Sequence, residues 1–245
     1  RLFMPVIKNG AAKVDDLFAG LPVEYIPVPV TEIRPVASAE QFSDITKRLP
    51  DFDWIVFSSA NGVELFFDGI APKNMPRIAC VGPDTAALLE ERGYTVEFMP
   101  SSYTGADLAE EFSAKFADKK FNILLPRPQK MGSAVDEMLT AKGHSIESFI
   151  LYTTEPISEP APLESNPEAD DIFAFRSPSG VRAFIDNYEL PENVWAVAIG
   201  PTTAAALKDA GHKLVVTANE SSRVGLIAAV SDLLKQLDTE AEEQS

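Results

Sequence analysis

Cysteine and histidine are scarce in this sequence of 245 residues. The single cysteine, Cys80, excludes an internal disulfide and fits a chain that folds in a reducing compartment. It lies in an apolar run, so we expect it to fill core space rather than to act as a nucleophile. The two histidines, His144 and His212, each follow a glycine, as residues just after a helix end often do. With so few soft ligands and only scattered carboxylates, the sequence predicts no metal site.

Long apolar runs and positive charge are also lacking. No run approaches the roughly 20 residues that cross a bilayer, and no cationic-then-apolar signal segment opens the chain. The formal net charge is −16, which argues against nucleic acid and anionic membranes as partners. We therefore expect a cytoplasmic protein that binds neither. The acidic residues 238–245 are predicted to form a disordered tail.

Motifs for cofactors and for strong nucleophiles are absent as well. The sequence has no G-x-G-x-x-G and no G-x-x-x-x-G-K-[ST], so dinucleotide and Walker-type phosphate binding have no support. It has no G-x-S-x-G elbow, and its two histidines do not suggest a Ser/His/Asp triad. Any catalysis is therefore expected to depend on binding, orientation and hydrogen bonds, without a cofactor.

What the sequence does contain is an internal repeat. Residues 53–108 match residues 171–226 at an offset of 118 without a gap, and both copies carry Ser-x-x-Gly-Val and Gly-Pro-x-Thr-Ala-Ala. In this stretch 15 positions are identical, whereas average composition gives roughly 4 by chance. The remaining segments pair more weakly, at offsets of 121 to 123. We interpret the chain as two copies of one ancestral half.

Short apolar runs alternate with amphipathic stretches of ten or more residues in both copies. The runs are apolar on both faces, as in parallel strands that helices cover on each side. The predicted fold class is α/β, with two doubly wound, mostly parallel, flavodoxin-like domains of about five strands each from an internal duplication. The ten expected strands are 2–6, 23–28, 53–58, 78–82, 95–98, 121–126, 146–151, 171–176, 194–199 and 213–217.

The pattern by itself leaves two divisions into domains. The copies could follow one another, with a boundary near residue 118, or one could be inserted into the other. In the second case two extended, proline-bearing connections, Pro27–Pro35 and Thr153–Pro162, would join them. No linker is visible near residue 118, which favours insertion. The domains predicted on this basis are a discontinuous one of residues 1–33 and 155–245 and an inserted one of residues 37–151.

Ligands of open α/β sheets bind beyond the carboxyl ends of the strands. At those positions this sequence carries mostly hydroxyl residues and glycines that open a helix, where free N–H groups and the helix dipole suit anions. Each serine or threonine taken singly is as well explained by helix N-capping, but a whole rim of them favours an anion site. The binding candidates on this rim are Ser59, Asn61, Thr85, Tyr103, Thr104, Ser177, Ser179, Thr202 and Thr203.

In the order and spacing of these loops, the chain resembles the uroporphyrinogen-III synthase family. The resemblance covers nearly the whole chain, although no single motif is specific. One departure is Pro5-Val6-Ile7, which stands where the family usually has Thr-Arg-Pro after the first strand. The segments that carry the resemblance are Phe57–Val63, Val81–Ala86, Leu124–Arg127, Tyr152–Thr154, Phe175–Val181 and Ile199–Ala204.

The resemblance implies a hydro-lyase of haem biosynthesis. Such an enzyme converts linear hydroxymethylbilane into uroporphyrinogen III, losing water, closing the macrocycle and inverting the last ring. It would be a monomer without a cofactor, would receive its substrate from hydroxymethylbilane synthase, and would have a long cleft between two lobes. By the same resemblance, Tyr152 helps the substrate hydroxyl to leave. The net charge of −16 does not attract a polycarboxylate, so local cations would be needed. The candidates are Arg127, Lys130 and Arg176.

Two functions of other classes also fit a two-lobed α/β protein with a hydroxyl-rich rim. One is a solute-binding protein, a class usually exported with a signal that is not visible here. The other is a regulator that senses a small anion without turning it over. Incubation with hydroxymethylbilane, followed by separation of the uroporphyrinogen isomers, distinguishes these three functions.

Overall fold

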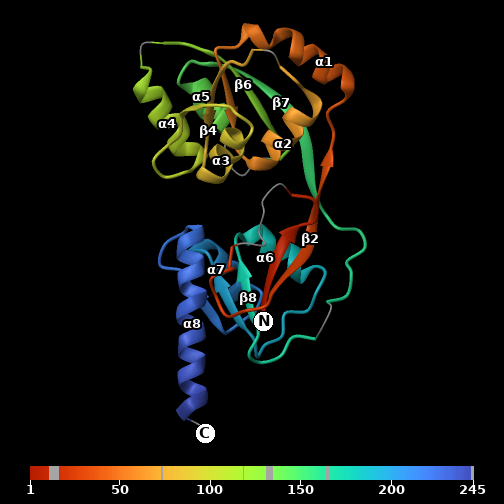
Figure 1. Ribbon diagram of the computed structural model, residues 1–245, viewed down its shortest axis with the longest axis vertical. Coiled ribbons are helices and arrows are strands. Elements are labelled where there is room, and N and C mark those ends of the chain that lie inside the picture. The colour runs from red at the N-terminus through yellow and green to blue at the C-terminus, as the bar shows by residue number, and fades with distance from the viewer. Residues whose placement is uncertain (11–16, 73, 118, 131–134, 164–165, 244–245) are drawn as a thin grey trace. The chain divides into compact units, whose positions relative to one another are not determined.

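The computed structural model describes residues 1–10, 17–72, 74–117, 119–130, 135–163 and 166–243. The chain forms two compact units. Unit 1 comprises Arg1–Glu32 and Glu155–Ser245, and unit 2 comprises Ile33–Thr154. In Figure 1 both chain ends belong to unit 1, which is coloured red at one end of the sequence and blue-green to blue at the other. Residues 34–36 and 152–154, which the sequence left between the two expected domains, are part of unit 2.

Unit 1 is a parallel sheet in the order β2-β1-β8-β9-β10. The strands alternate their side chains between the two faces, and both faces are apolar. Phe3 packs with α6 and α7 on one face, while Leu2 and Met4 pack with α8 on the other. The elements are β1 (Leu2–Ile7), β2 (Tyr25–Pro35), β8 (Ile172–Phe175), α6 (Pro178–Ile185), β9 (Trp195–Ala198), α7 (Pro201–Asp209), β10 (Val215–Thr217) and α8 (Arg223–Glu243).

Unit 2 contains a sheet in the order β7-β6-β3-β4-β5, with parallel pairs. Trp54 lies in the core between this sheet and the helices α4 and α5, and Phe57 packs on Phe66 of α2. The elements are α1 (Ala39–Arg48), η1 (Leu49–Asp51), β3 (Trp54–Phe57), α2 (Ala60–Gly69), β4 (Arg77–Cys80), α3 (Pro83–Glu91), β5 (Val96–Phe98), α4 (Gly105–Lys115), β6 (Asn122–Pro128), α5 (Val135–Ala141) and β7 (Ser145–Pro156).

The two units share one strand order once the sequence repeat is used to match them. Strands β8, β9 and β10 correspond to β3, β4 and β5 at the offset of 118, and β1 and β2 correspond to β6 and β7 at the weaker offsets. The order β2-β1-β8-β9-β10 in unit 1 therefore matches the order β7-β6-β3-β4-β5 in unit 2, strand for strand. The duplicated, mostly parallel α/β fold predicted from the sequence is confirmed, and all ten expected strands are present.

The chain crosses between the units within the two extended stretches that the sequence predicted as connections. Pro27–Pro35 lies within β2, and Thr153–Pro156 lies within β7, so the chain passes between the units as continuous strand. Because Val36 N donates to Leu151 O at 2.9 Å and Ile157 N donates to Val30 O at 3.2 Å, the two strands run antiparallel.

Several local predictions can be compared with the structure. Gly93 and Gly211 follow α3 and α7 with φ of +83° and +88°, as expected of helix C-caps. The prediction of a disordered tail is wrong for residues 238–243, because α8 continues through Glu243. Residues 244–245 lie outside the described part of the chain. Good helix formers such as glutamate and alanine dominate this stretch, which explains the longer helix. No helix among the described residues is long and apolar enough to cross a membrane.

Candidate functional site

Tyr152 lies on β7 of unit 2, and its hydroxyl is directed at the start of α2. The residue is only 3% exposed, and its Oη lies 3.0 Å from the Oγ of Ser59. Burial raises the pKa of the phenol above its ordinary value, while hydrogen bonds with the side chains of Ser59 and Asn61 lower it. The phenol is therefore neutral at physiological pH, and both neighbours favour its ionised form.

Ser59 has a second, structural contact. It is the N-cap of α2, and its Oγ accepts a hydrogen bond from the backbone N–H of Gly62 at 3.1 Å. This explains why the sequence has a serine at this position three residues before a glycine. The cap fixes the Oγ of Ser59 in space, and so fixes the partner of the Tyr152 hydroxyl.

The same cap recurs in unit 1 without a tyrosine. Ser177 is the N-cap of α6 and accepts from Gly180 N at 3.0 Å, but its Oγ lies 3.0 Å from the Oγ of Ser179. The residue that corresponds to Tyr152 is Thr31, because Lys8 N donates to its carbonyl at 2.8 Å just as Gln129 N donates to that of Tyr152 at 2.7 Å. Both bonds follow a register shift at the end of the strand pair. The fold itself therefore does not require a tyrosine at this position.

The predicted cations differ in their surroundings. Arg127, at the end of β6, donates from Nε to the Oγ of Ser148 at 3.0 Å and forms an ion pair with Asp136 at 3.3 Å. Its charge is thus largely compensated inside unit 2. Lys130 is exposed, and among the described residues no ion pair or hydrogen bond is found for it. Arg176 is exposed in unit 1. Nothing in the spacing of Asp136 and Ser148 links them to Arg127, so these two contacts could not be predicted from the sequence.

The threonines of the rim divide into buried and exposed ones. Thr85 and Thr203, the third residues of α3 and α7, are 5% and 1% exposed. Both residues are therefore buried, unlike the exposed members of the rim, and their part in binding stays a prediction. Thr104 is exposed, but its Oγ1 accepts from Asp107 N at 3.1 Å and contacts that carboxylate, so it acts as the N-cap of α4. Thr202 and Ser179 are exposed in unit 1.

Tyr103 is an unusual residue of unit 2. It is 53% exposed, and its φ of +55° lies in the left-handed region that non-glycine residues seldom adopt. A Cβ built at Gly82 would lie 3.9 Å from the Cβ of Tyr103, so Tyr103 lies next to the loop that opens α3. Strained residues of this kind concentrate at functional sites, which agrees with its selection from the sequence.

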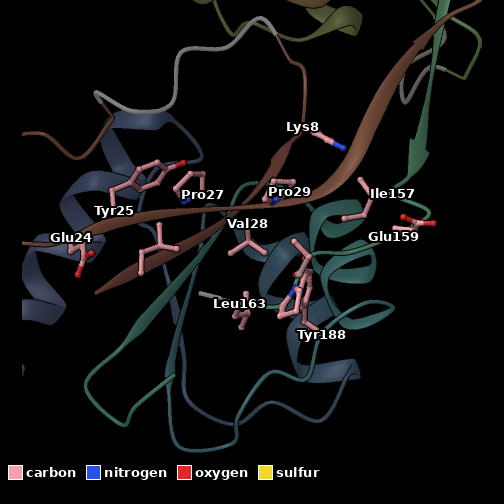
Figure 2. A pocket seen from close by; sticks show the side chains of 13 residues that line it. Lys8, Glu24, Tyr25, Pro27, Val28, Pro29, Ile157, Glu159, Leu163 and Tyr188 are labelled. Carbon is pink, nitrogen blue, oxygen red and sulfur yellow. The ribbon is translucent and has the colours of Figure 1, made fainter. Parts of the chain in front are cut away.

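Two cavities of unit 1 are lined mainly by residues that the sequence analysis did not select. The first, of about 380 Å³, lies beside β2. Figure 2 shows Tyr188 near the strand that carries Pro27 and Val28, with Lys8 and Glu159 at the edge. The second, of about 420 Å³, lies between α6 and α7 and includes Thr202. Segments far apart in sequence meet at the first cavity, so no local motif could have shown it.

The described residues provide neither a reactive thiol nor a metal site. Burial raises the pKa of the Cys80 thiol to about 12, although a backbone hydrogen bond of Gly82 opposes this shift. The thiol is therefore not a nucleophile at neutral pH, as the sequence predicted. Among the described residues, no three histidine, cysteine or acidic side chains are close enough to hold a metal ion.

Comparison with known proteins gives the chain a clear set of relatives. The family model described as uroporphyrinogen-III synthase HemD matches residues 14–228. The uroporphyrinogen-III synthase of Chlorobaculum parvum is 29% identical over 227 residues, which cover 84% of this chain and 88% of that protein. That of Synechococcus elongatus is 25% identical over 230 residues, covering 86% of each.

Other relatives are longer than this chain. The match spans 40% of the porphyrin biosynthesis protein HemD of Ruminiclostridium josui and 64% of the chloroplastic uroporphyrinogen-III synthase of rice, each at 28% identity. Among solved structures, the uroporphyrinogen-III synthetase of Helicobacter pylori aligns over 95% of this chain and 99% of its own, with a TM-score of 0.66 and 19% identity. This likeness agrees with the two-domain α/β fold described above.

Proposed function

Because the chain belongs to the uroporphyrinogen-III synthase family, we propose that it converts hydroxymethylbilane into uroporphyrinogen III. The reaction removes water, closes the macrocycle and inverts the last ring, so the protein would be a hydro-lyase of tetrapyrrole biosynthesis. The observation that carries this proposal is the family match over residues 14–228, which includes both copies of the repeat and the Ser59–Tyr152 contact.

We further propose that Tyr152 supplies the proton for the departing hydroxyl. The phenol is neutral, and it is held by a hydrogen bond at a place where the duplicated fold does not need it. Its burial makes a packing role the competing explanation, since a tyrosine with a bonded hydroxyl is also a good core residue. A variant that removes only the hydroxyl separates the two roles.

Carboxylate binding is proposed for the exposed part of each rim. In unit 2 the suitable residues are Tyr103 and Lys130, and in unit 1 they are Ser179 and Thr202. Backbone N–H groups at the N-termini of helices would also donate hydrogen bonds to the substrate carboxylates, because such hydrogen bonds are favourable there. The protein would need no cofactor for this chemistry.

The setting of the reaction is also a proposal. We expect a monomer in the cytoplasm that takes hydroxymethylbilane from the synthase that makes it. The net charge of −16 repels a polycarboxylate at long range, so association should become faster as ionic strength rises. A carrier or sensor of the same ligand is the alternative function.

The test is incubation of the purified protein with hydroxymethylbilane and separation of the uroporphyrinogen isomers against a buffer control. We expect isomer III to accumulate in proportion to protein and time. A protein that binds the bilane but leaves the isomer pattern equal to that of the buffer control would be a carrier or a sensor instead.

A further inference from the structure

The hydroxyl of Ser59 links the start of α2 to the phenol of Tyr152. Its Oγ accepts from Gly62 N at 3.1 Å and lies 3.0 Å from the Tyr152 Oη. A serine hydroxyl has one proton, which can be donated either to Tyr152 or elsewhere. If Ser59 donates, the phenol proton stays available for a ligand, whereas if Tyr152 donates, that proton is held by the protein.

Asn61 provides a second contact to the same oxygen. Its side chain is hydrogen-bonded to the Tyr152 phenol, and this bond and that of Ser59 both favour the ionised phenol. Because the Oγ of Ser59 already accepts from Gly62 N, its own proton can be donated to the phenol oxygen, and the directions of the two pKa effects agree with donors on both side chains. The N–H of Gly62 strengthens the Ser59 hydroxyl as a donor, because hydrogen bonds in a chain polarise one another.

The other copy of the repeat shows that this arrangement is not a requirement of the fold. There the positions of Asn61 and Tyr152 are occupied by Ser179 and Thr31, and the capping hydroxyl of Ser177 bonds to Ser179 instead. The cap is thus common to both copies, whereas the two residues that complete the contact to a phenol occur together in one copy only.

We propose that Ser59 and Asn61 are positioning residues for Tyr152: both donate hydrogen bonds to its phenol oxygen, so that the phenol proton is presented to the substrate. The inference rests on the proposed function and assigns Ser59 and Asn61 to the phenol rather than to a substrate carboxylate. The C–O bond of the substrate breaks with its electron pair on the hydroxyl oxygen, which takes the phenol proton and leaves as water. The two donors stabilise the phenolate until the proton released on ring closure restores the phenol.

The charged side chains around Tyr152 do not provide this stabilisation. The elements beside it carry charged residues, namely Glu64 and Asp68 on α2, Arg127 on β6, Glu32 and Arg34 on β2, and Glu147 and Glu155 on β7. The causes of the shifted phenol pKa are burial, Ser59 and Asn61, and none of these charges. The pH dependence of the phenol should therefore respond to the two hydrogen-bonding residues.

The test compares Ser59→Ala, Asn61→Leu and Ser59→Thr with the wild-type enzyme. We expect Ser59→Ala to lower kcat up to about tenfold with little change in KM, since one neutral hydrogen bond is worth about 0.5–1.5 kcal/mol. Ser59→Thr keeps the hydroxyl and should remain within about twofold of wild type. In both Ser59→Ala and Asn61→Leu, the alkaline limb of the kcat–pH profile should move to higher pH, because the phenolate has lost a donor.

A measurement without turnover separates this inference from the proposed function. The carbon-13 NMR signal of the Tyr152 ring, assigned with Tyr152→Phe, should titrate at higher pH in Ser59→Ala and Asn61→Leu than in the wild-type protein. An unchanged titration would overturn the inference, and so would a Ser59→Ala effect confined to KM. If the titration moves but no isomer III is formed, the donors are correctly assigned and the proposed function is wrong.

Ser177→Ala controls for the loss of a helix cap. Both caps accept one backbone N–H, so Ser59→Ala and Ser177→Ala should lower the free energy of unfolding by similar amounts, about 1 kcal/mol. If Ser59→Ala unfolds the protein while Ser177→Ala does not, the NMR titration of the other two variants still tests the inference. The Tyr152 signal should then titrate at higher pH in Asn61→Leu and near the wild-type pH in Ser59→Thr.

Discussion

At the scale of residues, the duplicated chain differs between its copies where chemistry is proposed. Tyr152 is replaced by Thr31 and Asn61 by Ser179, while the capping serines are the same in both copies. A tyrosine that only filled space beside the capped helix would be expected in either copy. We therefore base the first of the following predictions on the hydroxyl of Tyr152.

Tyr152→Phe should lower turnover at least tenfold, because general acid assistance typically contributes about 10²–10⁴-fold and a water molecule can replace part of it. The melting temperature should fall by no more than a few degrees, since the ring stays packed and only the contacts of the hydroxyl with Ser59 and Asn61 are lost. Isomer III formation and thermal unfolding are the measurements.

Tyr188→Phe is the matched control for that substitution. Its Oη donates to the carbonyl of Ala161 at 2.9 Å in unit 1, so the same group and one hydrogen bond are removed. We expect turnover within about twofold of wild type. A Tyr152→Phe enzyme that works at the wild-type rate would show that Tyr152 only packs.

At the scale of elements, the turns that end helices depend on glycine at two matching places. Gly93 and Gly211 have positive φ values after α3 and α7, and a Cβ at either would meet no atom within 4 Å. The cost of replacing them is therefore one of backbone conformation alone. Gly20 likewise has open space around it, but its φ is not in the left-handed region.

Gly211→Ala should lower the free energy of unfolding by about 1–2 kcal/mol, because L-residues other than asparagine and aspartate are strained in this conformation. Gly211→Asn should cost less. Gly20→Ala should leave stability unchanged or raise it by up to about 1 kcal/mol, by reducing the entropy of the unfolded chain. Denaturant unfolding measures all three, and equal losses at positions 20 and 211 would refute the conformational argument.

At the scale of the whole molecule, two buried histidines connect stability to pH. His144 accepts from Phe121 N through Nδ1 at 3.3 Å, and His212 lies 3.0 Å through Nε2 from the carbonyl of Val194. Burial lowers the pKa of both, helped at His144 by Lys120 and opposed at His212 by Val194 and Glu192. Both are therefore neutral in the folded protein at pH 7.

Because the folded pKa values lie below the unfolded value of about 6.5, the unfolded state binds protons more readily as pH falls. We expect the free energy of unfolding to be highest above pH 7 and to decrease from pH 7 to pH 5.5. Unfolding curves at several pH values measure this slope, which should be shallower in His144→Asn. If the free energy of unfolding did not change between pH 7 and pH 5.5, or rose as the pH fell, the lowered pKa values of the two histidines would be contradicted.

The sequence by itself determined the fold class, the ten strands and the internal repeat. These depend on local apolar patterns and on turn residues such as Gly93, whose physical causes act within a few residues. It also identified the serines at positions 59 and 177, because an N-cap leaves a local signature. Tyr152 was singled out only through a family resemblance.

Only the tertiary structure decided which of these residues meet. It placed Ser59 against Tyr152, 93 positions away, and Arg127 against Asp136 and Ser148. It buried Thr85 and Thr203, which the sequence could not distinguish from exposed caps. It also showed that the predicted extended connections are parts of β2 and β7. Partners distant in sequence are fixed by strand register and by packing between elements, and neither is encoded in local spacing.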